Sequence, residues 1–313
     1  MPGPPTPDTP LRLGTRRSPL AMAQAEEAKA RLVAAHGWVQ DAVELVPVVA
    51  SGDKVQDRPL SEIGGKALWT RELDAWLIEN RIDAAVHSMK DVETIRPQEL
   101  AIAAILPRAD KADRLLGAMT IAELPEGATV GTSAPRRAAQ LLHARPDCRA
   151  VTFRGNVATR MAKLEAGEVD ATFLAAAGLE RLGEDGVGVR LDPERWLPAP
   201  AQAAIGIECR AGDAETMQWF AALDHAASRA EIVAERALLA ALGGSCHSPV
   251  AVLTGGDGDA MTMRAAIYSE CGMERIAGET TFVAGDHAPV RALAAELLGK
   301  APEKVRCLFA GPA

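Results

Sequence analysis

The stretch Leu11–Gln24, LRLGTRRSPLAMAQ, shows the pattern that decides the fold. The run Leu11–Thr15 predicts a buried strand. Ser18 is a typical helix N-cap residue and Pro19 suits the first helical position, so a helix is predicted from there to about His36. Cationic and hydroxyl side chains therefore stand where a strand ends and a helix begins.

The alternation of strands and helices continues along the chain, which is typical of α/β units. Further strands are predicted at 43–50, 82–86, 128–131, 149–153 and 170–175, with helices at about 66–80, 135–143 and 157–166. The Pro-rich bend 197–200 predicts a crossover. From about residue 232 a helix, a Gly-rich turn, strands and a final helix near 288–299 indicate a smaller α+β domain.

Composition excludes several classes of protein. The length of 313 residues favours two or three domains. A net charge of 34 − 42 = −8 and 4% aromatic residues argue against nucleic-acid binding. No apolar run reaches the roughly 18 residues of a membrane span, and the Pro-rich segment 1–10 predicts a disordered tail rather than a signal peptide. The 5 cysteines contain no CxxC pair, which argues against zinc or a disulfide framework and favours a reducing cytoplasm.

Polar and cationic motifs follow the predicted strands repeatedly. They comprise Arg16, Arg17 and Ser18; His87 to Asp91; Gly131 to Arg137; Arg154 to Asn156, with Arg160 in the next helix; and Arg181. Ligands of open α/β sheets bind beyond the carboxyl ends of the strands, and helix N-termini and arginine forks both accept carboxylates. The pattern predicts a ligand that bears several carboxylates. For any single arginine, a solvated surface charge is the alternative.

Two segments carry candidate reactive groups. Asp91 beside Lys90 is the best acid–base candidate, with a salt bridge or helix cap as the alternative. His87 and His247 are predicted to be packed rather than catalytic. In Leu242–Val250, LGGSCHSPV, glycines allow Cys246 to present its sulfur, which indicates a covalently held anionic group. The other cysteines are interpreted as structural or incidental: Cys148, Cys209, Cys271 and Cys307.

Seven motifs occur in the order found in porphobilinogen deaminases, also called hydroxymethylbilane synthases. They are GTRRSPLAMAQ, VHSMKD, GTSAPRR, FRGNVATR, LAAAGLERL, PAPAQAAIGIE and GGSCHSPV. The chain resembles this family from about residue 11 to its C-terminus. The resemblance implies α/β domains at 11–106 plus about 204–226 and at 107–203, like the lobes of a periplasmic binding protein with an active cleft between them. It also implies a third, small α+β domain at 227–313 and a monomer.

The resemblance implies a transferase of haem and tetrapyrrole biosynthesis. Such an enzyme condenses four porphobilinogen molecules head to tail, loses ammonia each time, and releases the linear tetrapyrrole hydroxymethylbilane by hydrolysis. The primer is a dipyrromethane cofactor, one per chain, bound here through a thioether to Cys246. No metal is implied.

The family roles transfer to matching positions of this sequence. Asp91 becomes the catalytic carboxylate, which stabilises an azafulvene-like cation. Cofactor carboxylates would be held by Lys90, Ser133, Arg136 and Arg137. Cofactor and incoming substrate would both be bound by Arg16, Ser18, Arg154 and Arg160, and Arg181 would serve the growing chain.

Some positions depart from the family pattern. Ala134 and Pro135 interrupt a segment that is commonly GTSSLRR, which removes one hydroxyl and stiffens the helix start. Ala201 and Ala203 replace the glycines of PAPGQGAIGIE, which predicts a more restricted crossover.

Two other functions use the same residues. One is a non-enzymatic anion-binding protein with the two-lobed fold. The other is a cysteine hydrolase that uses Cys246 and His247, although adjacent residues seldom face one another. Of the three functions, only the tetrapyrrole-forming transferase requires a permanent dipyrrole adduct. The intact mass of the purified protein therefore discriminates among them.

Overall fold

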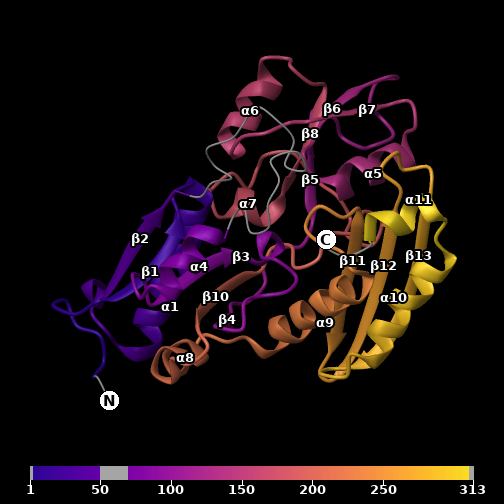
Figure 1. The fold of residues 1–313 in the computed structure, drawn as a ribbon. Helices are drawn as coiled ribbons and strands as arrows, with labels where there is room; N and C mark the ends of the chain where they lie inside the picture. Colours follow the sequence, from indigo (N-terminus) through magenta and orange to yellow (C-terminus); the bar gives the residue numbers. More distant parts are fainter. Residues whose placement is uncertain (1–2, 50–69, 310–313) are drawn as a thin grey trace. The chain divides into compact units, whose positions relative to one another are not determined.

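The computed structural model describes residues 3–49 and 70–309. The chain forms two compact units within this range. Of the described residues, the first unit contains 3–49, 70–109 and 204–229, and the second contains 110–203 and 230–309. Figure 1 shows their helices and strands. In the segment predicted as a disordered tail, Thr6 and Thr9 exchange backbone hydrogen bonds of 3.2 and 3.0 Å and form a turn.

The first unit is built on a five-stranded sheet with the order β2-β1-β3-β10-β4. Strands β1 (Leu11–Arg16), β2 (Val43–Val48) and β3 (Ala84–Ser88) are parallel. Strand β10 (Ile205–Arg210) lies antiparallel between β3 and β4 (Leu100–Ile105). The three strands predicted at 11–15, 43–50 and 82–86 are present, but β2 ends at Val48 and the third strand spans Ala84–Ser88, two residues later than predicted; residue 50 is outside the described residues.

Helices pack on both faces of this sheet because its strands are apolar on both sides. Helix α1 (Pro19–His36) and helix α8 (Ala214–Ala221) contribute to a core with Leu13, Val86 and Ile207. Helix α4 (Arg71–Ile78) packs in a second cluster with Val48 and Ala85. Residues 66–69 of the helix predicted at 66–80 lie outside the described residues. Two short 3-10 helices, η1 (Gln40–Ala42) and η2 (Met89–Asp91), precede β2 and follow β3.

The second unit contains another five-stranded sheet, with the order β7-β6-β8-β5-β9. Strands β6 (Thr129–Gly131), β7 (Arg149–Val151) and β8 (Ala171–Ala175) are parallel, as their alternation with helices predicted. Strand β5 (Asp113–Leu116) lies antiparallel between β8 and the short edge strand β9 (Val189–Arg190). The helices of this part are α5 (Pro135–Ala144), α6 (Val157–Glu165) and α7 (Ala176–Glu180).

The second unit also contains an antiparallel sheet of β11 (Val250–Asp257), β12 (Ala260–Tyr268) and β13 (Arg275–Val283). One face packs against α9 (Ala226–Leu242) and α10 (Ala288–Lys300), which lies along β13 in Figure 1. The chain then forms α11 (Glu303–Arg306) and η3 (Cys307–Phe309). The α+β character predicted for this region is confirmed. Its separation as a third domain stays a prediction, which the separate sheet supports.

Candidate active site

The predicted catalytic carboxylate, Asp91, lies in the turn that directly follows β3. Met89 is buried in this turn, and its amide donates to the carbonyl oxygen of Ala204 at 3.0 Å. A Cβ at Gly206 would lie 2.1 Å from Sδ of Met89, so any larger residue there would force the Met89 side chain to move. Met89 therefore anchors the turn, while Lys90 and Asp91 remain partly exposed.

A buried contact between two titratable side chains lies next to this turn. His87 on β3 is 6% exposed, which confirms that it is packed, and its Nε2 lies 3.4 Å from Oε2 of Glu208 on β10. Burial would raise the pKa of Glu208, but the nearby His87 and the two hydrogen bonds that Arg96 donates outweigh burial and lower this pKa to about 2. Glu208 is therefore ionised at neutral pH.

Arg16 and Ser18 reach the same edge of the first sheet as Asp91. Arg16 is the last residue of β1 and Ser18 follows it. Strand β1 is parallel to its neighbour β3, so both strands end at one edge. The hydroxyl of Ser18 accepts the amide of Ala21 at 3.3 Å and caps α1, as predicted. Arg16 is half-buried at the end of β1. One edge of the first unit thus carries Arg16, Ser18, Lys90 and Asp91.

In the second unit, the neighbouring strands β7, β6 and β8 also end at one edge, because they are parallel. Ser133 follows β6, and its hydroxyl donates to the carbonyl oxygen of Phe153 at 2.9 Å and accepts the amide of Phe153 at 3.2 Å. The amide of Ala134 donates to Oγ1 of Thr132 at 3.2 Å. Pro135 occupies the first position of α5. The departure from the family motif therefore still produces an ordered helix start.

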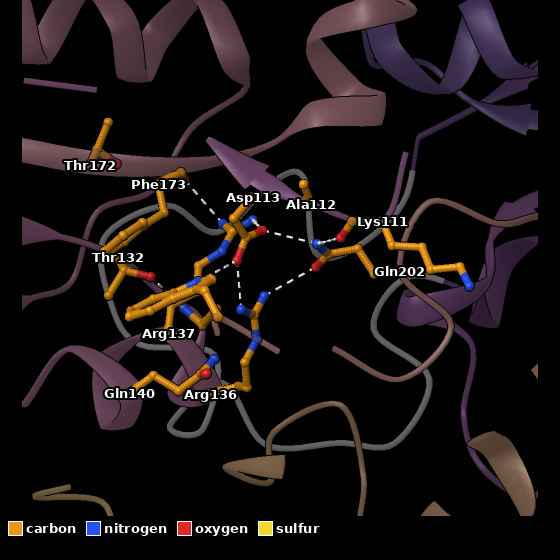
Figure 2. A network of polar contacts seen from close by, with 12 residues as sticks. Lys111, Ala112, Asp113, Thr132, Arg136, Arg137, Gln140, Thr172, Phe173 and Gln202 are labelled. Atoms are coloured by element: carbon orange, nitrogen blue, oxygen red, sulfur yellow. Dashed lines mark hydrogen bonds and ion pairs between the residues drawn. The ribbon is translucent and has the colours of Figure 1, made fainter. Parts of the chain in front are cut away.

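Arg136 and Arg137, at the start of α5, both bind the buried carboxylate of Asp113 (Figure 2). Nη1 of Arg136 lies 2.5 Å from Oδ2 of Asp113, and Nη2 of Arg137 lies 2.7 Å from Oδ1. Trp196 Nε1 and Gln202 Nε2 each donate to the same carboxylate at 2.9 Å. This arrangement orients both guanidinium groups, and the sequence interpretation did not include it.

The cluster carries one more positive than negative charge. Burial would raise the pKa of Asp113, but Arg136 and Arg137 outweigh burial and hold this pKa well below its ordinary range. Burial lowers the pKa of Arg136, against the opposing effect of Asp113. Among the described residues, Nε of Arg136 and Nε of Arg137 are buried without a hydrogen-bond partner. The excess positive charge and the guanidinium chemistry suit an anionic group such as a carboxylate.

The segment after β7 carries Arg154 in the loop before α6 and Arg160 in the first turn of that helix. Asn156 caps this helix, with its Oδ1 accepting the amide of Thr159 at 2.8 Å. Nε of Arg160 donates to the carbonyl oxygen of Gly155 at 2.9 Å, which directs the side chain back toward the loop. Arg154 and Arg160 are both half-buried.

The crossover places Gln202 between two alanines whose backbone is left-handed. The φ angles are 58° at Ala201 and 70° at Ala203, a conformation that costs an alanine about 1–2 kcal/mol. The amide of Ala201 donates to the buried Glu235 carboxylate at 2.6 Å, and Arg181 Nη2 donates to the carbonyl oxygen of Ala203 at 3.2 Å. These bonds hold the strained segment in place.

The turn that carries Cys246 begins where α9 ends. Gly243 has a φ of 68°, and its amide donates to the carbonyl oxygen of Ala240 at 3.0 Å. The amide of Gly244 donates to the carbonyl oxygen of Leu239 at 2.9 Å. The two bonds form a Schellman motif, in which glycine avoids the Cβ strain of left-handed backbone.

Hydrogen bonds also organise the remainder of this turn. The amide of Ser245 donates to Oγ of Ser248 at 3.0 Å, and the amide of His247 donates to Oγ of Ser245 at 3.2 Å. Cys246 is exposed, and none of the cysteines, all of which are described, forms a disulfide. The turn therefore presents an accessible thiol on a defined backbone.

Two negative findings concern the part of the chain that the structure describes. There, no group of at least 3 His, Cys, Asp or Glu side chains is arranged to hold a metal ion. No helix in residues 3–49 and 70–309 has the length and apolar character needed to cross a membrane.

The sequence interpretation missed the residues that hold the predicted site residues in place. These are Asp113, Gln202, Trp196, Arg96 and Glu208. A signal was present for Glu208, because it interrupts the apolar strand β10, and a charge in such a segment requires a buried partner.

Nearly the whole chain matches models of known protein families. Residues 11–218 match the family model described as "Porphobilinogen deaminase, dipyromethane cofactor binding domain". Residues 229–301 match the model described as "Porphobilinogen deaminase, C-terminal domain". The porphobilinogen deaminase of Sphingopyxis alaskensis is 55% identical and aligns over 97% of this chain and 98% of that protein. The porphobilinogen deaminase of Paracoccus denitrificans is 50% identical and aligns over 95% of this chain and 96% of that protein.

Solved structures give weaker likenesses. An ancestral cationic amino acid solute binding protein has a TM-score of 0.43 at 17% identity, covering 67% of this chain and 86% of that one. The periplasmic VFT2 domain of BvgS from Bordetella pertussis has a TM-score of 0.40 at 16% identity, covering 72% and 91%. Likenesses at this level carry no argument about ligand or function.

Proposed function

Because the chain belongs to the porphobilinogen deaminase family, we propose that the residues described above carry out that family's reaction. The reaction condenses four porphobilinogen molecules into hydroxymethylbilane with loss of ammonia, in the biosynthesis of haem and other tetrapyrroles. The match over nearly the full length of both relatives carries this proposal.

Asp91 is the proposed catalytic residue. Loss of ammonia from porphobilinogen leaves a cation on the substrate, and a nearby carboxylate stabilises that charge as it develops. The same group can relay a proton to the departing amine. The anchored turn after β3, with Asp91 partly exposed, supports this role.

Dipyrromethane is the family's cofactor, and we assign its thioether attachment to the exposed thiol of Cys246. When bound, the group supplies the primer onto which pyrrole units are added. Its carboxylates would be held by Lys90, Ser133, Arg136, Arg137, Arg16, Ser18, Arg154 and Arg160. Arg16, Arg154, Arg160 and Arg181 would bind substrate carboxylates. The excess positive charge around Asp113 supports this assignment for the arginine pair.

We further propose a cytoplasmic monomer. The cysteines, none of which forms a disulfide, suit a reducing compartment. Sedimentation at micromolar concentration should give the mass of one chain, and a stable dimer would contradict this part of the proposal.

Peptide mapping of the purified protein tests the assignment of Cys246. The dipyrrole mass should fall on the peptide with Cys246 and should survive thiol reagents, because a thioether is not reduced by exchange. Cys246→Ser should lack the adduct and activity, whereas Cys271→Ser, which alters another exposed thiol, should keep both. An adduct on another cysteine, or an active protein without an adduct, would overturn the mechanism. A protein without an adduct would instead favour the anion-binding or hydrolase function.

A further inference from the structure

The loop 92–99, between η2 and β4, has no regular secondary structure. Arg96 lies in this loop, yet its side chain is only 10% exposed. Its guanidinium group reaches inward to carboxylates from three different parts of the first unit. The loop that follows the proposed catalytic residue is therefore fastened through this side chain.

The contacts of Arg96 use the whole guanidinium fork. Nε and Nη2 donate to the two oxygens of Glu208 on β10, at 2.9 and 2.6 Å. Nη2 also donates to Asp74 on α4 at 2.6 Å, and Nη1 donates to Glu93 in the loop at 2.5 Å. The hydroxyl of Thr70 lies 2.8 Å from Oε2 of Glu93 and 3.1 Å from Oδ2 of Asp74. A planar bidentate grip of this kind is specific to arginine.

The charges make Arg96 necessary to the cluster. The side chains of Glu208, Asp74 and Glu93 are 2%, 11% and 23% exposed, so water stabilises them poorly. Burial would lower the pKa of Arg96, but the hydrogen bonds that it donates to Glu208 and Asp74 outweigh burial and raise this pKa. Arg96 therefore stays charged and holds carboxylates that would otherwise repel one another.

The turn that carries Asp91 consequently has an anchor on each side. Before it, the amide of Met89 binds the carbonyl oxygen of Ala204 at 3.0 Å. After it, Glu93 is bound by Arg96. We propose that Arg96 is a positioning residue, which holds the second anchor and so fixes the direction of the Asp91 carboxylate. This inference rests on the catalytic role proposed for Asp91.

Arg96→Lys tests the proposal, since lysine keeps the charge but lacks the planar fork. The expected result is a kcat about 10- to 100-fold lower per mole of cofactor-loaded enzyme, because small misplacements of reacting groups have effects of this size. KM should change less than about threefold, because substrate binding is retained. Glu93→Gln removes the other partner of the second anchor and should lower kcat in the same direction, which covers a failure of Arg96→Lys to fold.

Arg210→Lys is the matched control. Arg210 lies on β10 in the same unit, and its guanidinium binds the carbonyl oxygens of Leu77 and Ile82 and the carboxylate of Asp213. This substitution should lower stability without changing kcat of the folded enzyme. An equal loss of kcat in Arg96→Lys and Arg210→Lys would mean that Arg96 is merely structural and would overturn the proposal.

A double-mutant cycle tests whether Arg96 acts through Asp91. In the Asp91→Asn background, Arg96→Lys should produce little further loss of kcat, because the group that it positions is already disabled. Full additivity of the two losses would contradict the positioning role.

Hydrogen exchange gives a readout that needs no activity. Amides of residues 89–96 should exchange faster in Arg96→Lys than in the wild-type protein or in Arg210→Lys. If the wild-type protein carries no dipyrrole and turns over no porphobilinogen, the proposed function fails whatever the exchange shows. If the wild-type enzyme is active and Arg96→Lys leaves both amide exchange and kcat unchanged, the positioning role proposed for Arg96 is wrong.

Discussion

Asp91 can be tested at the scale of one residue, because asparagine has nearly the same shape without the charge. Asp91→Asn should lower kcat about 10²- to 10³-fold, since stabilisation of charge in a transition state has effects of this size. Steady-state rates measure the loss. Intact mass and the melting temperature should show that cofactor and fold are retained, and a rate near that of the wild type would sink the assignment.

The left-handed alanines of the crossover give a second test at this scale. Ala203→Gly should raise the free energy of unfolding by about 0.5–1 kcal/mol, because relief of strain exceeds the entropy that glycine adds to the unfolded chain. Ala201→Gly should raise it less, because the methyl group of Ala201 is buried and is lost. Denaturant unfolding measures the change.

Ala204→Gly is the control, since this neighbouring alanine is not among the described residues with positive φ. It should lower the free energy of unfolding by at least about 0.4–1 kcal/mol, because glycine adds entropy to the unfolded chain and the buried methyl group of Ala204 is lost. Destabilisation of the same size at Ala201, Ala203 and Ala204 would show that the strain is absent in solution.

At the scale of elements, Asp113 joins β5 to α5 through the arginine pair. Asp113→Asn leaves two buried guanidinium groups without their counter-charge, so it should lower the free energy of unfolding by about 3–5 kcal/mol. Thermal or denaturant unfolding checks the size of the loss.

Asp110→Asn provides the comparison from the same segment. Asp110 pairs with Arg190, and the two side chains are 31% and 49% exposed. Exposed pairs contribute about 0–1 kcal/mol, so the effect should be small. A similar loss in both variants would mean that burial of the Asp113 cluster has no special effect on stability.

Local patterns in the sequence predicted helix starts and strand ends well, because residues at those positions determine them. Ser18 and Pro19 fixed the start of α1, and the polar residues after β1, β3 and β6 marked strand ends. The partners of those residues could not be predicted in this way. Arg136 and Asp113 are 23 positions apart, and Arg96 and Glu208 are 112 apart. Such pairs depend on how the chain folds back, which no local pattern contains.

At the scale of the whole molecule, buried carboxylates make stability depend on pH. The pKa of Glu208 is lowered from 4.5 to about 2 in the folded protein, which corresponds to roughly 3 kcal/mol at neutral pH. Because the pKa of Glu208 is lower in the folded than in the unfolded protein, its ionised form stabilises the fold above the unfolded value of 4.5. This stabilisation is lost as the pH falls toward the folded value of about 2. The free energy of unfolding should therefore decrease as the pH falls from about 5 to about 2.

Chemical denaturation across this range measures the effect. Glu208→Gln should be less stable at neutral pH but should show a shallower slope between about pH 5 and pH 2, because one of the titrating groups is gone. Parallel curves for the two proteins would mean that Glu208 does not titrate as its surroundings indicate.

The position of β10 has a consequence for biogenesis. Among the described strands, β4 has β10 as its only neighbour, yet Ile105 and Ile205 are 205 − 105 = 100 positions apart. At a synthesis rate of about 5–20 residues per second, β4 leaves the ribosome roughly 5–20 s before its partner. All strands of the second five-stranded sheet are made within that interval. The nascent chain thus exposes an unpaired strand edge that chaperones can shield until β10 inserts.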